Sequence, residues 1–164
     1  MHTETIVFGG GCFWCTEAIF RMLKGVESVE PGYAGSPKAE VVKIEYNPDI
    51  IALEELLQVF FGSHDATQLN RQGPDVGPGY RSVIFYTTER QQTKSQHYIE
   101  VLNKNATQRI TTEVKPLETF YPAEEYHKNF YQSGQRPDYC ELVIDPKLEK
   151  VRNNYKNLLK PIQG

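Results

Sequence analysis

The order of segments along the sequence by itself predicts an α/β protein with a parallel sheet. Apolar stretches typical of strands alternate with amphipathic stretches typical of helices, and this alternation favours strand–helix–strand units. The 164 residues are enough for one domain with a sizeable core. Because no repeat, low-complexity tract or shift in composition marks a second domain, we expect a single domain over residues 1–164.

The first half of the chain carries two strand patterns and two helix patterns. Residues 5–10 (TIVFGG) have the pattern of a short strand that runs into a glycine turn. Residues 12–24 place apolar side chains at helical spacing, and Gly25 is a typical residue for the end of a helix. Residues 41–48 alternate like a half-buried strand, and residues 51–61 have the period of an amphipathic helix.

The second half continues with more polar elements. Residues 81–87 (RSVIFYT) have a nearly continuous apolar centre, which predicts a strand in a central position. Residues 88–106 predict a polar helix, and residues 110–115 predict another strand. We expect a short helix around residues 124–130 and a strand at residues 142–144.

Three segments lack a regular pattern. Residues 31–40 and 64–80 are long, and residues 132–140 (QSGQRPDYC) are rich in turn residues. Irregular segments on a rigid scaffold commonly carry binding and catalytic residues, so we expect part of a site there.

Composition and charge exclude several classes of protein. A hydrophobic content of 39% and a net charge of −3 are ordinary for a globular chain and favour neither nucleic acid nor an anionic membrane as a partner. No apolar run reaches the length of a membrane span, and the first residues lack the apolar core of a signal peptide. Three cysteines are too few, and odd in number, for a secreted disulfide framework. We therefore expect a reducing, cytoplasmic location.

The segment GGGCFWC (residues 9–15) has the features of an activated thiol. The three glycines let the backbone turn sharply and approach a ligand closely. Cys12 then falls in the first turn of the predicted helix, where unpaired N–H groups and the helix dipole favour a thiolate. A lone cysteine here could be a small buried hydrophobe, but the glycine run and the helix start favour a function.

Phe13 and Trp14 lie off the main apolar stripe of the predicted helix. Beside a nucleophile they indicate a pocket for a methyl or thioether group, and packing against a neighbouring loop is the alternative. Cys15 has two interpretations. Its spacing from Cys12 is that of redox Cys-x-x-Cys pairs, yet it also falls on the apolar stripe, where a cysteine only fills space.

Two groups of residues contain metal-ligating types. His64 and Asp65 are adjacent, and Glu124, Glu125 and His127 lie within four residues. Neither group is followed by a second pair of cysteines or histidines at zinc spacing. We therefore expect no metal site and a structural role for both groups.

Several long motifs resemble, in the same order, those of the A-type peptide methionine sulfoxide reductases. A bare Cys-x-x-Cys pair would not be specific, but the match starts at GCFWCTEAIF (residues 11–20) and extends over nearly the whole chain. The further matching segments are GYAG (residues 32–35), KAEVVKIEYNP (residues 38–48), LLQVFFGSHDATQLNRQGPDVGPGYRSVIFY (residues 56–86), FYPAEEYHKNFY (residues 120–131) and DYC (residues 138–140).

This resemblance implies a different fold class from the one that the pattern predicts. It implies an α+β protein with a mixed β-sheet and packed helices around a ferredoxin-like core, with long irregular loops and a C-terminal tail. It also implies a single catalytic domain that reduces methionine S-sulfoxide, in proteins and as the free compound, to methionine. The implied partners are oxidised proteins and small methionine sulfoxide substrates.

The resemblance also implies roles for individual residues. Cys12 matches the nucleophile that attacks the sulfoxide sulfur, and Phe13 and Trp14 match the pair that forms the methyl pocket. Glu40 matches the acid that protonates the sulfoxide oxygen. This is chemically reasonable because a glutamate in a hydrophobic pocket tends to stay protonated.

Asp75 and Tyr80 match polar residues that form hydrogen bonds with the substrate or its oxygen. After the attack, Cys12 would carry a sulfenic acid, and a second cysteine would condense with it to a disulfide. Cys15 and Cys140 are both candidates for this resolving role, and a relay through both is possible. The resemblance implies thioredoxin or another dithiol as the external reductant, with no bound cofactor.

The sequence departs from the family pattern in one place. Many members insert a longer segment, including a tyrosine that helps to bind the sulfoxide oxygen, where this chain has only GYAGSPKAE (residues 32–40). Lys38 also stands where histidine is usual. Glu40 and Tyr80 would then contribute more to the binding of the sulfoxide oxygen, or another aromatic residue replaces that tyrosine.

Two other functions fit parts of the sequence. The first is a thioredoxin-like disulfide oxidoreductase that uses Cys12 and Cys15, although that fold expects a tryptophan before the first cysteine and a cis-proline loop facing it, and neither is evident in the sequence. The second is a non-catalytic module whose aromatic pocket binds methionine. Replacing Cys12 by Ser separates these functions, since a binding module would keep its affinity.

Overall fold

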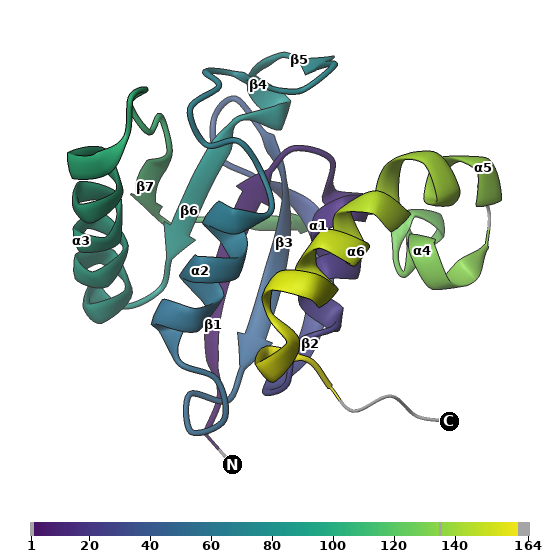
Figure 1. Cartoon of the computed structure of the whole chain (residues 1–164), viewed down its shortest axis with the longest axis horizontal. Helices are drawn as coiled ribbons and strands as arrows, with labels where there is room; N and C mark the ends of the chain where they lie inside the picture. Colours follow the sequence, from purple (N-terminus) through teal and green to yellow (C-terminus); the bar gives the residue numbers. More distant parts are fainter. Residues whose placement is uncertain (1, 135, 161–164) are drawn as a thin grey trace.

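The structure, a computed structural model, describes residues 2–134 and 136–160, without the side chains of residues 126, 137, 140 and 141. Its centre is a six-stranded sheet with the order β7-β6-β1-β3-β2-β8 (Figure 1). All neighbouring strands are antiparallel except β6 and β7, which are parallel. The strands are β1 (Glu4–Gly10), β2 (Val26–Ala34), β3 (Ala39–Tyr46), β6 (Ser82–Tyr86), β7 (Glu113–Pro116) and β8 (Phe120–Pro122).

Helices and short segments complete the fold. A small hairpin of β4 and β5 precedes β6. The remaining elements are β4 (Arg71–Gln72), β5 (Asp75–Val76), α1 (Phe13–Arg21), α2 (Leu53–Gly62), α3 (Glu89–Asn105), α4 (Phe130–Ser133), α5 (Pro137–Tyr139), α6 (Asp145–Asn154), the 3-10 helices η1 (Pro78–Tyr80), η2 (Glu125–His127) and η4 (Lys156–Leu158), and the π-helix η3 (Cys140–Ile144).

The sheet corrects the fold class that the alternating pattern predicted. A parallel sheet is wrong, and the mixed sheet with packed helices implied by the resemblance is confirmed. The pattern failed because it assumed that each helix connects two adjacent parallel strands. In fact β3 lies between β1 and β2 and runs antiparallel to both of them.

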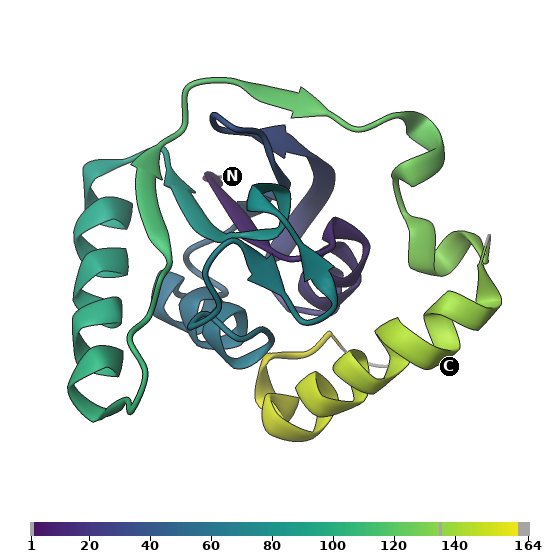
Figure 2. The same cartoon turned by 90° about the horizontal axis from the view of Figure 1, so that it is seen from above.

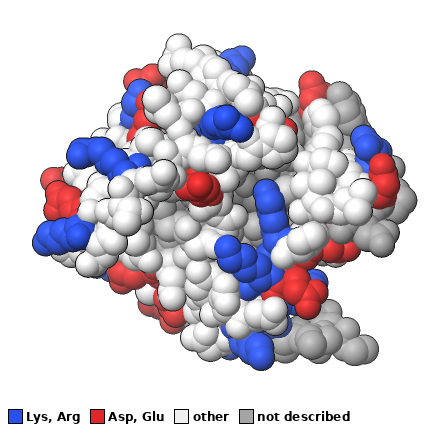
Figure 3. Space-filling view, turned by 45° about the horizontal axis from the view of Figure 1, so that its top comes forward, with Lys and Arg blue, Asp and Glu red and all other residues white. Residues whose placement is uncertain are grey.

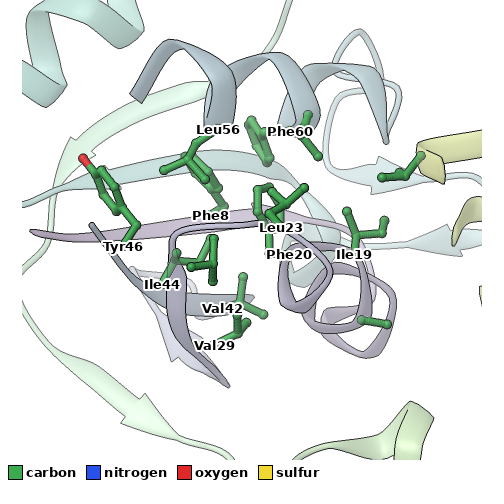
Figure 4. Close-up of a cluster of buried hydrophobic side chains, with 14 of the residues drawn as sticks. Phe8, Ile19, Phe20, Leu23, Val29, Val42, Ile44, Tyr46, Leu56 and Phe60 are labelled. Carbon is green, nitrogen blue, oxygen red and sulfur yellow. The ribbon is translucent and has the colours of Figure 1, made fainter. Parts of the chain in front are cut away.

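The two faces of the sheet bury different side chains, because successive residues of a strand point to opposite sides. On β1, Ile6 and Phe8 face the larger core, which α1, α2 and α6 cover, and Val7 faces the smaller one. Phe8 stacks on Phe60 of α2 with ring centroids 4.5 Å apart, at the centre of the larger core (Figure 4). The smaller core is closed by Phe120 and other apolar residues that follow β7.

The C-terminal part of the chain returns to α1. Figure 2 shows the long connection through β8 to the short helices and then to α6, which packs against α1. Leu159 forms an isolated bridge with Leu23, just after α1. These contacts place α6 and Leu159 beside α1, the helix that starts with the two N-terminal cysteines.

Most of the predicted elements are present, but two predictions are wrong. Residues 31–40 are not irregular throughout, because β2 includes Pro31 and Gly32. The Pro31 carbonyl accepts a hydrogen bond from the Ala123 N–H. A Cβ on Gly32 would lie 2.4 Å from the Phe120 ring, so only glycine fits at this position. Both residues therefore allow β8 to pack against β2. Pro and Gly weaken a strand signal in the sequence, and this strand was therefore missed.

The predicted strand at residues 142–144 is also wrong. These residues belong to η3, which leads into α6. Ile144 is buried in the larger core and Leu142 is exposed, so the apolar triplet does not mark a strand. An apolar run this short does not distinguish a strand from a buried helix.

Charged side chains of both signs are interspersed over the face shown in Figure 3. None of the described helices has the combination of length and apolarity that crossing a bilayer requires.

Replacement of Leu56 by Ala tests the larger core. Leu56 is 0% exposed, so the cavity left behind should lower the free energy of unfolding by about 2–5 kcal/mol. Ile50→Ala, at a side chain that is 56% exposed, is the matched control and should change it by about 0.5 kcal/mol or less. Urea denaturation measures both, and equal losses would contradict this description of the core.

Candidate active site

Cys12 lies at the start of α1, where the sequence predicted it. Gly11 has a φ of +101°, a conformation that favours glycine, and it turns the chain from β1 into the helix. Cys12 is the N-cap residue, and its carbonyl accepts the N–H groups of Cys15 at 3.2 Å and Thr16 at 3.4 Å. Gly9 and Gly10 lie in β1, where a Cβ would come within 2.9 Å of Val83 and 3.1 Å of His64, so close packing favours glycine at both positions.

A pocket of about 340 Å³ opens beside Cys12. Its wall is formed by Cys12, Phe13, Trp14, Tyr33, Glu40, Asp75, Tyr80, His127 and Tyr139. The structure thus brings together all six residues that the resemblance carried over as nucleophile, acid, hydrogen-bonding partners and methyl pocket. These residues come from α1, β3, β5 and η1, which are separate in the sequence.

Glu40 lines the same pocket as Cys12 and is held in place by the backbone of α1. The Phe13 N–H donates a hydrogen bond to Glu40 Oε1 at 3.2 Å, and the Tyr80 hydroxyl forms a second hydrogen bond with this carboxyl. Burial, followed by the proximity of Cys12 and Asp75, raises the pKa of Glu40 to about 7. A carboxyl with this pKa can donate a proton near neutral pH.

The other side of the pocket is aromatic. Phe13 is only 4% exposed, and its ring centroid lies 5.5 Å from that of Tyr33. Trp14 stacks on Phe130 with centroids 3.9 Å apart, and the His127 ring lies 5.5 Å from Trp14. This wall offers contacts to an apolar or sulfur-containing group.

Tyr139 was not predicted as a site residue. Its hydroxyl donates a hydrogen bond to the Cys12 sulfur at 3.4 Å, and its ring packs edge-on against Trp14 at 5.5 Å. Burial and the adjacent Cys12 raise the pKa of Tyr139, so the hydroxyl remains a donor. The only signal in the sequence was its position directly before Cys140.

Cys12 and Cys15 form a coupled pair of thiols. A hydrogen bond between their side chains raises the pKa of Cys12, as does burial, and it lowers the pKa of Cys15. With the further help of the Lys147 ammonium, the pKa of Cys15 falls to about 7. Each thiol therefore changes the pKa of the other. The expectation that the helix start favours a Cys12 thiolate stays a prediction.

The two candidates for the resolving cysteine differ in what the structure describes. Cys15 is 3% exposed on α1 and packs in the larger core, so it is at once a core residue and a neighbour of Cys12. The side chain of Cys140 lies outside the described residues, although its backbone begins η3 directly after Tyr139.

The two groups of residues that could in principle bind a metal ion, around His64 and around His127, have other contacts in the structure. His64 is within hydrogen-bond distance of the Phe60 carbonyl and the Ser82 hydroxyl, at 2.6 and 2.8 Å, and burial lowers its pKa to about 4. His127 lies 3.5 Å from Glu124 and lines the pocket. Within the described residues, no cluster of three or more such side chains could hold a metal ion.

A coupled thiol pair opposite a carboxyl that can donate a proton defines a thiol-dependent oxidoreductase. Residues 4–159 match the family described as peptide methionine sulfoxide reductase. The peptide methionine sulfoxide reductase MsrA of Haloquadratum walsbyi is 46% identical to this chain over an alignment of 172 residues, gaps included. The alignment covers 96% of this chain and 99% of that protein.

Solved structures agree with this match. The reduced form of Mxr1 from Saccharomyces cerevisiae has a TM-score of 0.76 and 31% identity, over 80% of this chain and 86% of that one. Mxr1 in complex with Trx2 has a TM-score of 0.62 and 30% identity, over 76% and 84% of the two chains. The chain therefore belongs to the peptide methionine sulfoxide reductase family.

Replacement of Tyr139 by Phe tests the hydrogen bond to the nucleophile. Without the hydroxyl, the Cys12 thiolate loses a donor, so the midpoint of Cys12 alkylation should move up by about one pH unit. Iodoacetamide labelling followed by peptide mass spectrometry measures this midpoint. Tyr121→Phe, at an exposed tyrosine away from Cys12, is the control, and an equal midpoint in both variants would contradict the contact.

Proposed function

We propose that this chain reduces methionine S-sulfoxide, free and within proteins, to methionine. The observation that carries the proposal is the shared pocket, in which the Cys12 sulfur and the Glu40 carboxyl lie beside an aromatic wall. The methyl group of the substrate fits against Phe13 and Trp14, which leaves the sulfoxide group between Cys12 and Glu40. Cys12 and Trp14 are half-buried rather than enclosed, so a side chain presented from another protein can enter.

The proposed reaction starts with attack of the Cys12 sulfur on the sulfoxide sulfur. Glu40 gives its proton to the sulfoxide oxygen as the S=O bond breaks, and Tyr80 and Asp75 hold this oxygen or the substrate by hydrogen bonds. Methionine leaves, and Cys12 carries a sulfenic acid. Condensation with a second thiol releases water and forms an intramolecular disulfide.

Cys15 and Cys140 are both retained as proposed resolving residues. Cys15 lies one turn after Cys12 at the start of α1, and its N–H donates to the Cys12 carbonyl at 3.2 Å, which supports a direct disulfide. Cys140 follows Tyr139, whose hydroxyl contacts the Cys12 sulfur, which supports an approach from the C-terminal side. A relay through both thiols is consistent with these positions.

Thioredoxin is the proposed reductant of the disulfide, or another dithiol in its place. Support comes from the structure of the related Mxr1 in complex with Trx2. A chain that is itself a thioredoxin-like disulfide oxidoreductase is not favoured, because residues 4–159 match a methionine sulfoxide reductase family. We propose the cytoplasm as the location and a reaction without a bound cofactor.

We also propose that residues 1–164 form one catalytic domain with a ferredoxin-like core. The elements β1, α1, β2, β3, α2 and β6 follow one another in the order strand, helix, strand, strand, helix, strand. Their four strands are antiparallel and lie in the order β6-β1-β3-β2, which supports this assignment.

Replacement of Glu40 by Gln tests the acid. Glutamine keeps the size of the side chain but has no proton to give, so the rate of methionine formation in a single turnover should fall roughly 100-fold or more. In the unchanged protein this rate should decrease as the pH rises through about 7, because Glu40 then loses its proton. The rate of the variant and the pH dependence of the unchanged protein are both measured by chromatography of the methionine that forms in a single turnover, with no reductant added.

Glu45→Gln is the control for this experiment, because Glu45 lies on the same strand outside the pocket. It should keep the unchanged rate and pH profile. A Glu40→Gln variant with the rate of the control would remove Glu40 from the mechanism.

Replacement of Cys12 by Ser tests the function itself. The variant should form no methionine, whereas the unchanged protein should form one methionine and one disulfide per sulfoxide consumed. Peptide mapping by mass spectrometry then identifies the partner of Cys12. Turnover by the Ser variant would contradict the proposal, and a disulfide to Cys15 or to Cys140 decides which thiol resolves.

A further inference from the structure

Glu17 of α1 is a buried acid that the proposed reaction does not use. It is 1% exposed. One turn further along the helix, the Arg21 guanidinium pairs with Glu17 Oε2 at 3.2 Å. The same guanidinium donates a hydrogen bond to the Val29 carbonyl of β2 at 2.9 Å. The ion pair uses only one of the two carboxylate oxygens, so the carboxylate can accept further hydrogen bonds.

The further donors come from a distant segment of the chain. The Asn129 N–H donates to Glu17 Oε2 at 2.8 Å, and the Phe130 N–H donates to Glu17 Oε1 at 3.3 Å. Asn129 has a φ of +54°, a conformation that asparagine adopts more readily than most residues, and the two hydrogen bonds stabilise it. One side chain of α1 therefore holds the backbone at the start of α4, 112 residues further along the chain.

Phe130 connects this backbone to the substrate pocket. Its buried ring stacks on Trp14 with centroids 3.9 Å apart and an angle of 9° between the ring planes. Tyr139 packs edge-on against both rings, at 5.5 Å from Trp14 and 5.9 Å from Phe130. Because Trp14 lines the pocket, a displacement of Phe130 would change the shape of the aromatic wall.

A gain in stability alone does not account for a buried acid at this position. The desolvation of two buried charges offsets much of their attraction, and well-packed apolar side chains of similar volume are often as stable. A carboxylate differs from an apolar side chain in direction, because it accepts hydrogen bonds only from donors in suitable positions. Glu17 should therefore act mainly on the geometry of the segment that it holds.

We infer that Glu17 is a positioning residue for substrate binding, which holds residues 129 and 130 against α1 so that Phe130 keeps the Trp14 ring in place beside the substrate methyl group. The inference rests on the proposed function and deepens it. Glu17 takes no part in the chemical step. The Phe13 N–H holds Glu40 independently of this contact.

Replacement of Glu17 by Gln tests the inference. Glutamine keeps the size of the side chain, but it has no charge for Arg21 and the two N–H groups. Single turnovers are followed with increasing concentrations of free methionine sulfoxide in excess over the protein. The half-saturating concentration should rise about tenfold, because the methyl group loses a fixed wall. The limiting rate should change much less, because Cys12 and Glu40 keep their positions.

Trp14 supplies a second readout, because it is the only tryptophan in the sequence. Its fluorescence, excited where tyrosine does not absorb, reports on the aromatic wall without any substrate. In Glu17→Gln, acrylamide should quench this fluorescence more strongly than in the unchanged protein. Phe130→Leu leaves the carboxylate in place but removes the stacked ring, and it should increase the quenching and the half-saturating concentration in the same way.

Glu54→Gln and Leu56→Ala are the matched controls. Glu54 forms an ion pair with Lys94 at 3.1 Å on the surface, so its replacement removes the same charge from a different helix. Leu56→Ala weakens the larger core from α2, which contributes no side chain to the described wall of the pocket. Both variants should keep the quenching and the half-saturating concentration of the unchanged protein while they are folded.

The inference would be overturned if Glu17→Gln matched Glu54→Gln in both measurements. It would also be overturned if the limiting rate fell at an unchanged half-saturating concentration, or if Leu56→Ala reproduced both changes. Should Glu17→Gln not fold, Glu17→Asp takes its place, since a shorter side chain withdraws the carboxylate from the two N–H groups but keeps its charge. The same outcomes then decide.

These results differ from a failure of the proposed function. In that case the unchanged protein itself would form no methionine from the sulfoxide. The fluorescence of Trp14 would still show whether Glu17 holds the aromatic wall in place.

Discussion

The hydrogen bond from the Phe13 N–H to Glu40 is the contact on which the site depends. It joins the start of α1 to β3, and the sheet makes it possible because β1 and β3 are antiparallel neighbours with Phe8 opposite Val42. The end of β1 therefore meets the beginning of β3, which places Glu40 beside Cys12. A slip of β3 by one residue would turn Glu40 to the opposite face of the sheet and separate the acid from the thiol.

Burial alone would make this site inactive, because it favours the neutral form of every acid in it. For Glu40 this effect is useful, since it leaves a carboxyl that can give a proton at neutral pH. For Cys15 it is opposed by the interaction with Cys12 and by the nearby Lys147, and for Cys12 it is opposed by the hydrogen bond from Tyr139. Burial thus raises the pKa of the carboxyl, while neighbouring groups lower the pKa of Cys15 beside the same pocket.

The sequence predicted what is local and missed what depends on distant segments. The glycine turn and the start of α1 follow from short-range signals, so the position of Cys12 was predicted correctly. Glu40 was found only through the resemblance, since nothing on its strand marks an acid. Tyr139 and Lys147 carry no local signal, because their contacts with Cys12 and Cys15 arise only when the C-terminal segment folds back on α1.

The connection between β2 and β3 is short. Gly35, with a φ of +88°, turns the chain within a few residues from Ala34 to Ala39, which leaves no room for the tyrosine that many family members carry there. A tyrosine hydroxyl that faces the Cys12 sulfur comes from Tyr139 of α5. A site built in this way is complete only while the C-terminal helices rest on α1, so the buried face of α6 supports both the fold and the electrostatics of the thiol pair.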